Sequence, residues 1–100
     1  MKLQIHSVHF DADQKLLDFI QRKSSKLETF YDRIIDGEVF LRIDKGEHSR
    51  ENKLVEIKLN IPGATLFAKQ QDISFEAATD EAVESLRRQI KKHKEKNSVR

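Results

Sequence analysis

The sequence predicts an α+β fold, a β-α-β-β-β-α two-layer sandwich in which two helices pack on one face of a four-stranded sheet. Three observations give this prediction: short segments alternate apolar and polar residues, two longer segments have helical apolar spacing, and turn residues separate the segments. The chain has 100 residues, 37% of them hydrophobic, which suits one small core. We expect a single domain over residues 1–96 and a short tail over residues 97–100.

The first strand and the first helix are predicted in the first third of the chain. Apolar and polar residues alternate over residues 2–8, as in a half-buried strand. Asp11 is expected as the N-cap of the helix, Gln14 as its reciprocal capping residue, and Asp36-Gly37 as its end. The helical face is predicted from Leu16, Ile20, Leu27, Tyr31 and Ile34, with Phe19 and Phe30 at its edge.

Three more strands are expected as a meander over residues 38–44, 53–61 and 65–70. Their apolar residues alternate, so one side of each strand is predicted to face the helices. Pro62-Gly63 predicts the turn between the last two strands.

The second helix is expected over residues 74–96, with Ser74 as its N-cap and no glycine or proline inside it. Its apolar face is predicted from Phe75, Ala78, Ala82, Leu86 and Ile90. Acidic residues occupy its first half, and its last turns carry Arg87, Arg88, Lys91, Lys92, Lys94 and Lys96. This order complements the helix dipole, but the dipole acts mainly on the last turn. The basic run therefore also predicts a contact surface for a negatively charged partner.

Charge is unevenly distributed along a chain whose net charge is only +2. Residues 86–100 hold seven of the 19 Lys and Arg residues and one acid, a net charge of +6, whereas residues 1–85 carry −4. On the first helix, at about 100° per residue, Lys15, Arg22, Lys26 and Arg33 form one stripe, with Lys23 beside it. Such a stripe is either a solvated helix face or a functional surface. A basic groove between or across the two helices would suit phosphate groups.

The sequence contains no recognisable catalytic or metal-binding pattern. It has no Cys, and its three Gly residues form no phosphate-binding loop. His6 and His9 are expected on opposite faces of a strand, and His93 is expected near the apolar face of the second helix as a helix-packing or RNA-edge residue. No segment approaches the roughly 18–20 apolar residues of a membrane span, and no signal-peptide core follows Met1. We expect a cytoplasmic protein that is not an enzyme and has no cofactor, no metal, no membrane contact and no small-molecule substrate.

The aromatic residues argue against nucleic-acid recognition by stacking on the sheet. Only Phe40 is clearly expected to point away from the helices. The remaining aromatic residues considered are expected in the core: Phe10, Phe19, Phe30, Tyr31 and Phe75. Recognition of backbone or shape through the helices fits this pattern better.

Two segments give the chain a family resemblance. "KLETFYDRI" at residues 26–34 and "AATDEAVESLRRQIKKHKEK" at residues 77–96 resemble the two helices of the hibernation-promoting factor and ribosome-associated inhibitor family. The opening "MKLQI", the order of elements and the length also agree, so the resemblance spans nearly the whole chain. One segment departs from the family pattern: its Asp-Leu/Met-Tyr before the second helix reads Ser74-Phe75-Glu76 here.

The resemblance implies a short-form member that binds the small ribosomal subunit and its 16S rRNA. Such proteins occupy the tRNA and mRNA sites and stop translation in stationary phase or starvation. The resemblance implies rRNA contacts at Lys23, Lys26, Arg88, Lys92 and Lys94. The charge pattern adds Arg22, Arg33, Arg87, Lys91 and Lys96. An alternative from another class stays open: a protein-interaction module whose basic surface binds an acidic protein partner such as a transcription factor.

Overall fold

A computed structural model describes residues 1–44, 46 and 50–98, apart from the side chains of residues 97 and 98. The elements along the chain are β1 (Lys2–Ser7), α1 (Gln14–Ser25), the 3-10 helix η1 (Lys26–Thr29), β2 (Asp36–Ile43), β3 (Lys53–Ile61), β4 (Ala64–Asp72) and α2 (Phe75–Ser98). The predicted order of strands and main helices is confirmed, and η1 is an addition to it.

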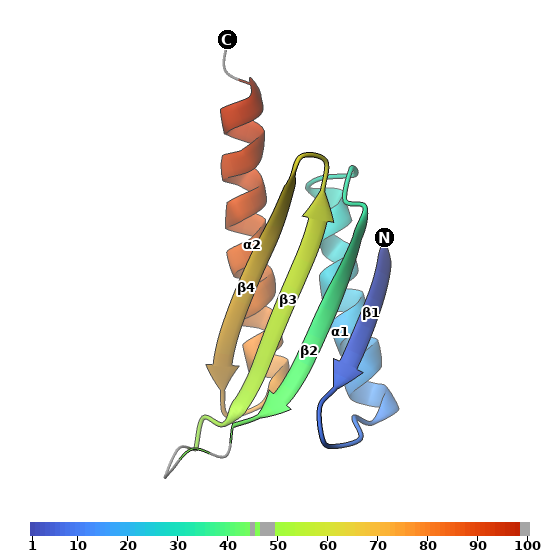
Figure 1. Cartoon of the computed structure of the whole chain (residues 1–100), viewed down its shortest axis with the longest axis vertical. Helices are drawn as coiled ribbons and strands as arrows, with labels where there is room; N and C mark the ends of the chain where they lie inside the picture. Colours follow the sequence, from blue (N-terminus) through green and yellow to red (C-terminus); the bar gives the residue numbers. More distant parts are fainter. Residues whose placement is uncertain (45, 47–49, 99–100) are drawn as a thin grey trace.

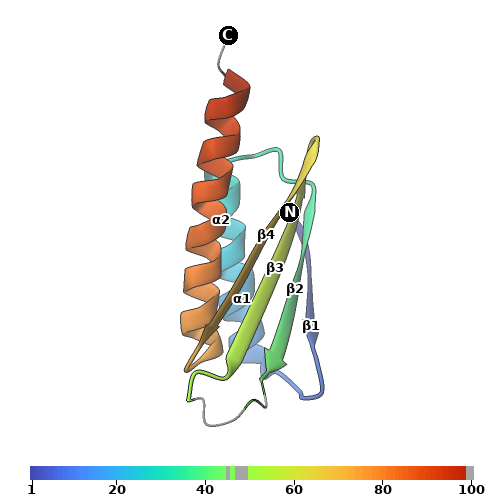
Figure 2. The same ribbon diagram turned by 60° about the vertical axis from the view of Figure 1, so that its left-hand side comes forward.

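The four strands form one sheet in the order β1-β2-β3-β4. β1 runs parallel to β2, with α1 as the crossover, whereas β2, β3 and β4 are antiparallel neighbours. Both helices lie on the same face of this sheet (Figures 1 and 2). α2 packs against β3 and β4, and α1 lies beside α2. The predicted two-layer α+β sandwich is therefore confirmed.

The core lies between the sheet and the helices. Alternate residues of the two central strands point into it, together with the apolar faces of both helices. The two-residue period of a strand and the 3.6-residue period of a helix place the apolar side chains on one side of each element. The buried hydrophobic residues are Leu16, Ile20, Leu27, Ile34, Val39, Leu41, Val55, Ile57, Leu59, Ile61, Ala68, Phe75, Ala78, Ala82, Leu86 and Ile90. The predicted face of the second helix is fully contained in this set.

The two helices are capped by side chains at their N-termini. Ser74 caps α2 as predicted, because its hydroxyl accepts a hydrogen bond from the backbone N–H of Ala77 at 3.0 Å. The first cap is Asp13 and not Asp11: its Oδ1 accepts from the backbone N–H of Leu16 at 2.9 Å. The helix therefore starts two residues later than predicted. Residue type alone did not distinguish the two aspartates, because either could serve as a cap.

The first helix is also shorter than predicted. α1 ends at Ser25, η1 ends at Thr29, and Tyr31 and Ile34 follow outside any helix. Residues 36–37 begin β2 and do not end the helix. Ile34 is nevertheless 7% exposed and belongs to the core. Apolar spacing thus indicated which residues are buried, while the backbone that buries them is not helical throughout.

The last turns of α2 project beyond the end of the sheet (Figure 1). The helix continues to Ser98, past the boundary expected at residue 96, and residues 99 and 100 lie outside the described part of the chain. These turns contact the segment that follows η1. The ring of His93 meets the ring of Tyr31 edge-on, with 5.9 Å between centroids. Of the two roles predicted for His93, this contact supports that of a packing residue.

Candidate functional site

A groove separates two parts of the helical layer. One side is formed by the end of α1 together with η1, and the other side by the neighbouring part of α2. One hollow, of about 540 Å³, is lined by Lys23, Lys26, Thr29, Phe30, Asp80, Val83, Glu84 and Arg87. A second hollow, of about 210 Å³, is lined by Phe30, Arg87, Ile90, Lys91, Lys94 and Glu95. Phe30 and Arg87 line both hollows. The two hollows are therefore one continuous surface, which we call the helix groove.

Helical geometry brings the groove residues of α2 together. Residues 80, 84, 87, 91 and 94 follow one another at spacings of four, three, four and three, which places them in one stripe along the helix. The stripe is acidic at its start and basic after Glu84. Lys23 and Lys26 face it from α1 and η1, whose opposite side is held by the buried Leu27.

Acidic partners hold several of the groove cations in place. The ammonium of Lys23 lies 3.0 Å from a carboxylate oxygen of Asp80, which links α1 to α2. Arg87 donates to the Oε2 of Glu84 from its Nε at 3.0 Å and also from a terminal guanidinium nitrogen. This hydrogen bonding lowers the pKa of Glu84 and raises the pKa of Arg87. The positive charge of the groove is thus partly compensated near Asp80 and Glu84.

Five of the ten predicted contact residues line the groove, namely Lys23, Lys26, Arg87, Lys91 and Lys94. The other five line neither hollow: Arg22, Arg33, Arg88, Lys92 and Lys96 are exposed outside them. Arg88 borders a third hollow, which shares the acidic Asp80 and Glu84 with the groove, and its side chain is 62% exposed. The predicted basic residues therefore form a groove with an exposed surrounding surface, and not a single stripe.

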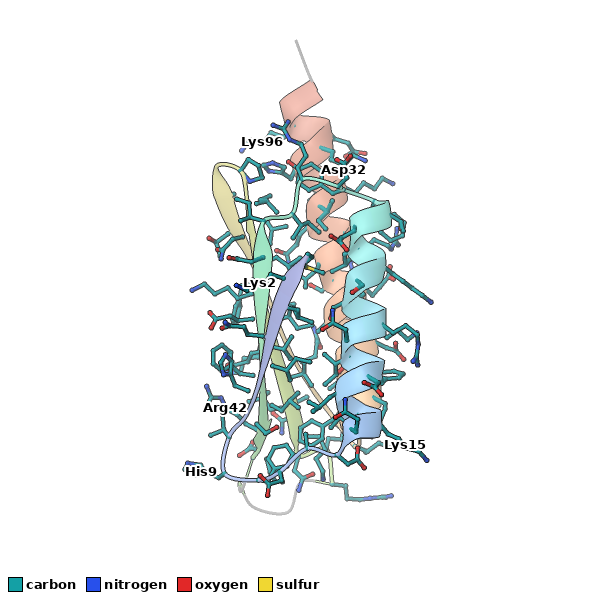
Figure 3. The ribbon with its side chains drawn as sticks, turned by 90° about the vertical axis from the view of Figure 1, so that its right-hand side faces the viewer. Lys2, His9, Lys15, Asp32, Arg42 and Lys96 are labelled. Carbon is teal, nitrogen blue, oxygen red and sulfur yellow. The ribbon has the colours of Figure 1, made fainter. Side chains whose placement is uncertain are left out.

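The predicted stripe on the first helix does not hold along its whole length. Lys15 lies near the start of α1, at the opposite end of the molecule from Lys96 (Figure 3). Arg33 follows η1 in non-helical chain, so helical spacing no longer relates it to Arg22. The guanidinium of Arg22 instead lies 5.6 Å from the ring centroid of Phe19, on α1 itself.

Phe30 is the groove residue that the sequence reasoning missed. It was expected in the core, yet 44% of its surface is exposed. The guanidinium carbon of Arg87 lies 5.7 Å from its ring centroid. The signal that could have found it was its position at the edge, and not the centre, of the predicted apolar face.

The outer face of the sheet carries one aromatic residue that was predicted there and one that was not. Phe40 faces away from the helices as predicted, between the buried Val39 and Leu41, and stacks on His6 with 4.8 Å between ring centroids. Phe67 is also turned away from the core and is 52% exposed, so Phe40 is not alone.

The rest of the described chain offers little for other chemistry. Within the residues that the structure describes, no group of three or more His, Cys, Asp or Glu side chains could hold a metal ion. None of the helices in this part of the chain is long and apolar enough to cross a bilayer. Glu81 and Asp72 share a hydrogen bond, which raises the pKa of Glu81 and lowers the pKa of Asp72. The helix groove is thus the candidate site.

The structure defines a small α+β domain whose helical side presents a basic groove. Residues 3–98 match the family described as "Sigma 54 modulation protein / S30EA ribosomal protein". The chain therefore belongs to this family, and the resemblance seen in its helices is confirmed.

Named relatives and solved structures agree with this assignment. The chain is 32% identical to the ribosome hibernation promoting factor of Pseudomonas putida over 96 residues, which are 96% of this chain and 89% of that protein. It is 30% identical to the factor of the same name from Escherichia coli K12, covering 96% of each. A relative named ribosome hibernation promotion factor from Deinococcus radiodurans is longer, since the chain matches 48% of it at 28% identity.

Two solved structures have the same fold. A ribosomal subunit interface protein from Coxiella burnetii superimposes with a TM-score of 0.82 at 20% identity, covering 94% of this chain and 98% of that one. The N-terminal domain of Protein Y from Thermus thermophilus gives 0.80 at 21% identity, covering 93% and 99%.

Proposed function

We propose that this chain is a ribosome hibernation factor. It binds the small ribosomal subunit through 16S rRNA, blocks the tRNA and mRNA sites, and inhibits translation in stationary phase or starvation. The observation that carries this proposal is the set of five basic side chains along the helix groove, with five more exposed outside it. The names of the relatives supply the biological setting. A cytoplasmic location follows from the proposed ribosomal partner.

In this proposal the chain acts by occupying space and not by catalysis. Lysine and arginine side chains neutralise rRNA phosphates, which gives affinity and register without reading sequence. The sheet and the helical layer share one apolar core, so the domain behaves as a rigid obstacle once it is bound. Lys96 lies on the turns of α2 that project beyond the sheet (Figure 3), where it can reach a surface that the sheet does not.

The first test is reversal of charge at Arg88 and Lys92. The variant Arg88→Glu/Lys92→Glu is expected to lose cosedimentation with purified small subunits, because two phosphate contacts become repulsive. Both side chains are exposed, so its melting temperature should stay close to that of the unchanged protein. Lys58→Glu/Lys69→Glu is the matched control: it makes the same change in net charge on the outer face of the sheet. If both double variants bound equally well, the assignment of rRNA contacts to Arg88 and Lys92 would be wrong.

Salt and tRNA competition test the remaining parts of the proposal. Affinity for small subunits should fall steeply between about 50 and 200 mM salt if several phosphates are neutralised. Saturating protein should also prevent tRNA from binding to programmed small subunits in a filter assay. Undiminished tRNA binding on saturated subunits would contradict the blocking of that site.

A protein partner is the second candidate function. The description of the family also names modulation of sigma 54, a protein, and a basic groove suits an acidic protein surface. Pull-downs with and without RNase separate the two. Ribosomal components should be lost after RNase treatment, whereas an acidic protein partner should remain.

A further inference from the structure

Phe30 is an exposed aromatic ring inside a basic groove. The large hydrophobic residues with exposed surface, within the described part of the chain, are Phe30, Ile35, Ile43, Phe67 and Ile73. Of these, Phe30 lines the helix groove, and it lies in both of its hollows. Phosphate neutralisation needs only cations, so it does not account for a phenylalanine at this place.

The backbone of Phe30 is held from two sides. Its N–H donates to the carbonyl oxygen of Leu27 at 3.0 Å, and Leu27 is fully buried. Its own carbonyl oxygen accepts a hydrogen bond from the Nζ of Lys94 at 2.8 Å. The ring therefore extends into the groove from a backbone that is held in place, and little backbone entropy is lost when a ligand contacts it.

Arg87 provides a second planar group beside the ring. Its guanidinium lies over Phe30 with 5.7 Å between the guanidinium carbon and the ring centroid. Two hydrogen bonds to Glu84 fix its orientation. Because Glu84 compensates part of its charge, Arg87 is also suited to stacking through its guanidinium plane.

The groove thus combines a fixed aromatic ring, a fixed guanidinium plane and flanking lysines. Unpaired nucleobases in RNA stack on aromatic rings and on arginine planes while lysines contact the adjacent phosphates. We propose that Phe30 and Arg87 form a stacking site for one unpaired nucleobase, with Lys26 and Lys91 beside it for the flanking phosphates. This inference rests on the proposed function and names the kind of rRNA element that the groove takes, a single-stranded one.

A single tryptophan can report on this stacking, because the chain contains none. Phe30→Trp places the indole in the groove, and Phe67→Trp places one on the outer face of the sheet, where the native residue is similarly exposed. The probes are purified small ribosomal subunits, a 12-nucleotide oligoadenylate and an RNA duplex of the same length. Fluorescence of Phe30→Trp should be quenched by the subunits and by the oligoadenylate but not by the duplex. Phe67→Trp should not respond to any of them.

Removing the ring tests the energetic contribution. Phe30→Ala should weaken binding to small subunits roughly 5- to 150-fold, the usual effect of losing one aromatic–base stack. Its slope of log affinity against log salt should equal that of the unchanged protein, because no phosphate contact is lost. Phe30→Tyr should bind normally, and Phe67→Ala serves as the control. The hydrogen bond from Lys94 goes to the backbone, so these variants keep it.

The outcomes separate this inference from the proposed function. Normal binding by Phe30→Ala, a reduced salt slope, or unquenched fluorescence of Phe30→Trp on small subunits would overturn the stacking site while leaving a phosphate-binding surface in place. If the unchanged protein does not bind small subunits, yet oligoadenylate quenches the indole of Phe30→Trp, the stacking site stands and the ribosomal function fails. Quenching of Phe30→Trp by the duplex as strongly as by the oligoadenylate would contradict the single-stranded preference.

Discussion

The ammonium of Lys94 is hydrogen-bonded to the backbone carbonyl oxygen of Phe30 at 2.8 Å, across 64 residues of sequence. This bond joins the projecting turns of α2 to the chain that leaves η1, next to the contact between His93 and Tyr31. Lys94 is therefore part of the internal structure of the groove. Basic residues that the sequence presents as equivalent thus have different roles.

Replacing Lys94 should cost stability, unlike replacing its neighbour. Lys94→Met keeps most of the aliphatic chain but removes the hydrogen-bond donor. It should lower the free energy of unfolding by about 0.5–1 kcal/mol. This is the lower part of the range for one hydrogen bond, because the site is exposed. Lys92→Met, at an exposed position outside the groove, should leave stability unchanged. Urea unfolding of both variants measures the difference. Equal stabilities would mean that the bond does not persist in solution.

Neutralising Glu84 should strengthen binding to small subunits. Glu84 pairs with Arg87 and lies 3.8 Å from Arg88, so its charge opposes an anionic ligand. The amide oxygen of Glu84→Gln can still accept from Arg87, so the variant should raise affinity at low salt by up to about fivefold, as expected for a surface pair worth at most about 1 kcal/mol. Glu76→Gln changes the net charge equally at the first turn of α2, away from the groove, and should have little effect. Titration of small subunits with both variants distinguishes a local effect from one of net charge.

The Asp72–Glu81 pair should make stability depend on pH in a defined direction. The hydrogen bond to Asp72, burial, and the charges of Asp72 and Glu51 raise the pKa of Glu81. A carboxyl group whose pKa is raised by folding destabilises the fold when it is ionised. For Glu81 this loss of stability is complete at pH 7, and it disappears as the pH falls below the ordinary pKa range of glutamate. Asp72, whose pKa is lowered, contributes stability above the ordinary aspartate range and loses it as the pH falls through its lowered pKa.

Glu81→Gln separates the two contributions. The amide can still donate a hydrogen bond to Asp72, while the repulsion between the two carboxylates is removed. The variant should therefore melt at a higher temperature than the unchanged protein at pH 7, and this advantage should shrink as the pH falls toward 4. Thermal melts at several pH values measure it. An advantage that grew on acidification would contradict the assignment.

The buried hydroxyl of Thr79 should be dispensable for folding. Among the described residues, the hydroxyl oxygens of Thr79 and Ser24 are buried without a hydrogen-bond partner. Thr79→Val replaces the hydroxyl by a methyl group of similar size, so it should stabilise the fold by about 1 kcal/mol. Thr79→Ala removes the hydroxyl and also leaves a cavity, and it should be less stable than the valine variant. A valine variant less stable than the unchanged protein would indicate that the hydroxyl is satisfied in solution.

Much of the fold could be predicted because its strands and its second helix have regular patterns. Alternation over β3 and the spacing from Phe75 to Ile90 identify single faces, and Ser74 stands at the matching cap position. The end of α1 could not be predicted in the same way. Tyr31 and Ile34 stand at helical spacing from Leu27, but spacing reports that side chains return to the core and does not fix the backbone between them.

The charges of the candidate site and its place between the two helices were predictable, but its contacts were not. Basic residues of α1 and α2 could be identified from the sequence, whereas the pairing of Lys23 with Asp80 depends on how the two helices pack. The exposure of Phe30 depends on the change from α1 to η1, which turns the chain before the ring reaches the core. The pairing has no signal in the spacing of residues along either helix, and the exposure of Phe30 has only its position at the edge of the predicted apolar face.

α2 has two different supports along its length. Up to about Ile90, the side chains of its inner face are buried against the sheet, whereas the turns beyond contact Phe30 and Tyr31. Amide hydrogens of the first part should exchange slowly with deuterated water and those of the last turns quickly, since local opening there exposes little apolar surface. The cations of those turns are then attached to the part of the helix that opens most readily. Bound RNA would slow amide exchange there far more than in the core.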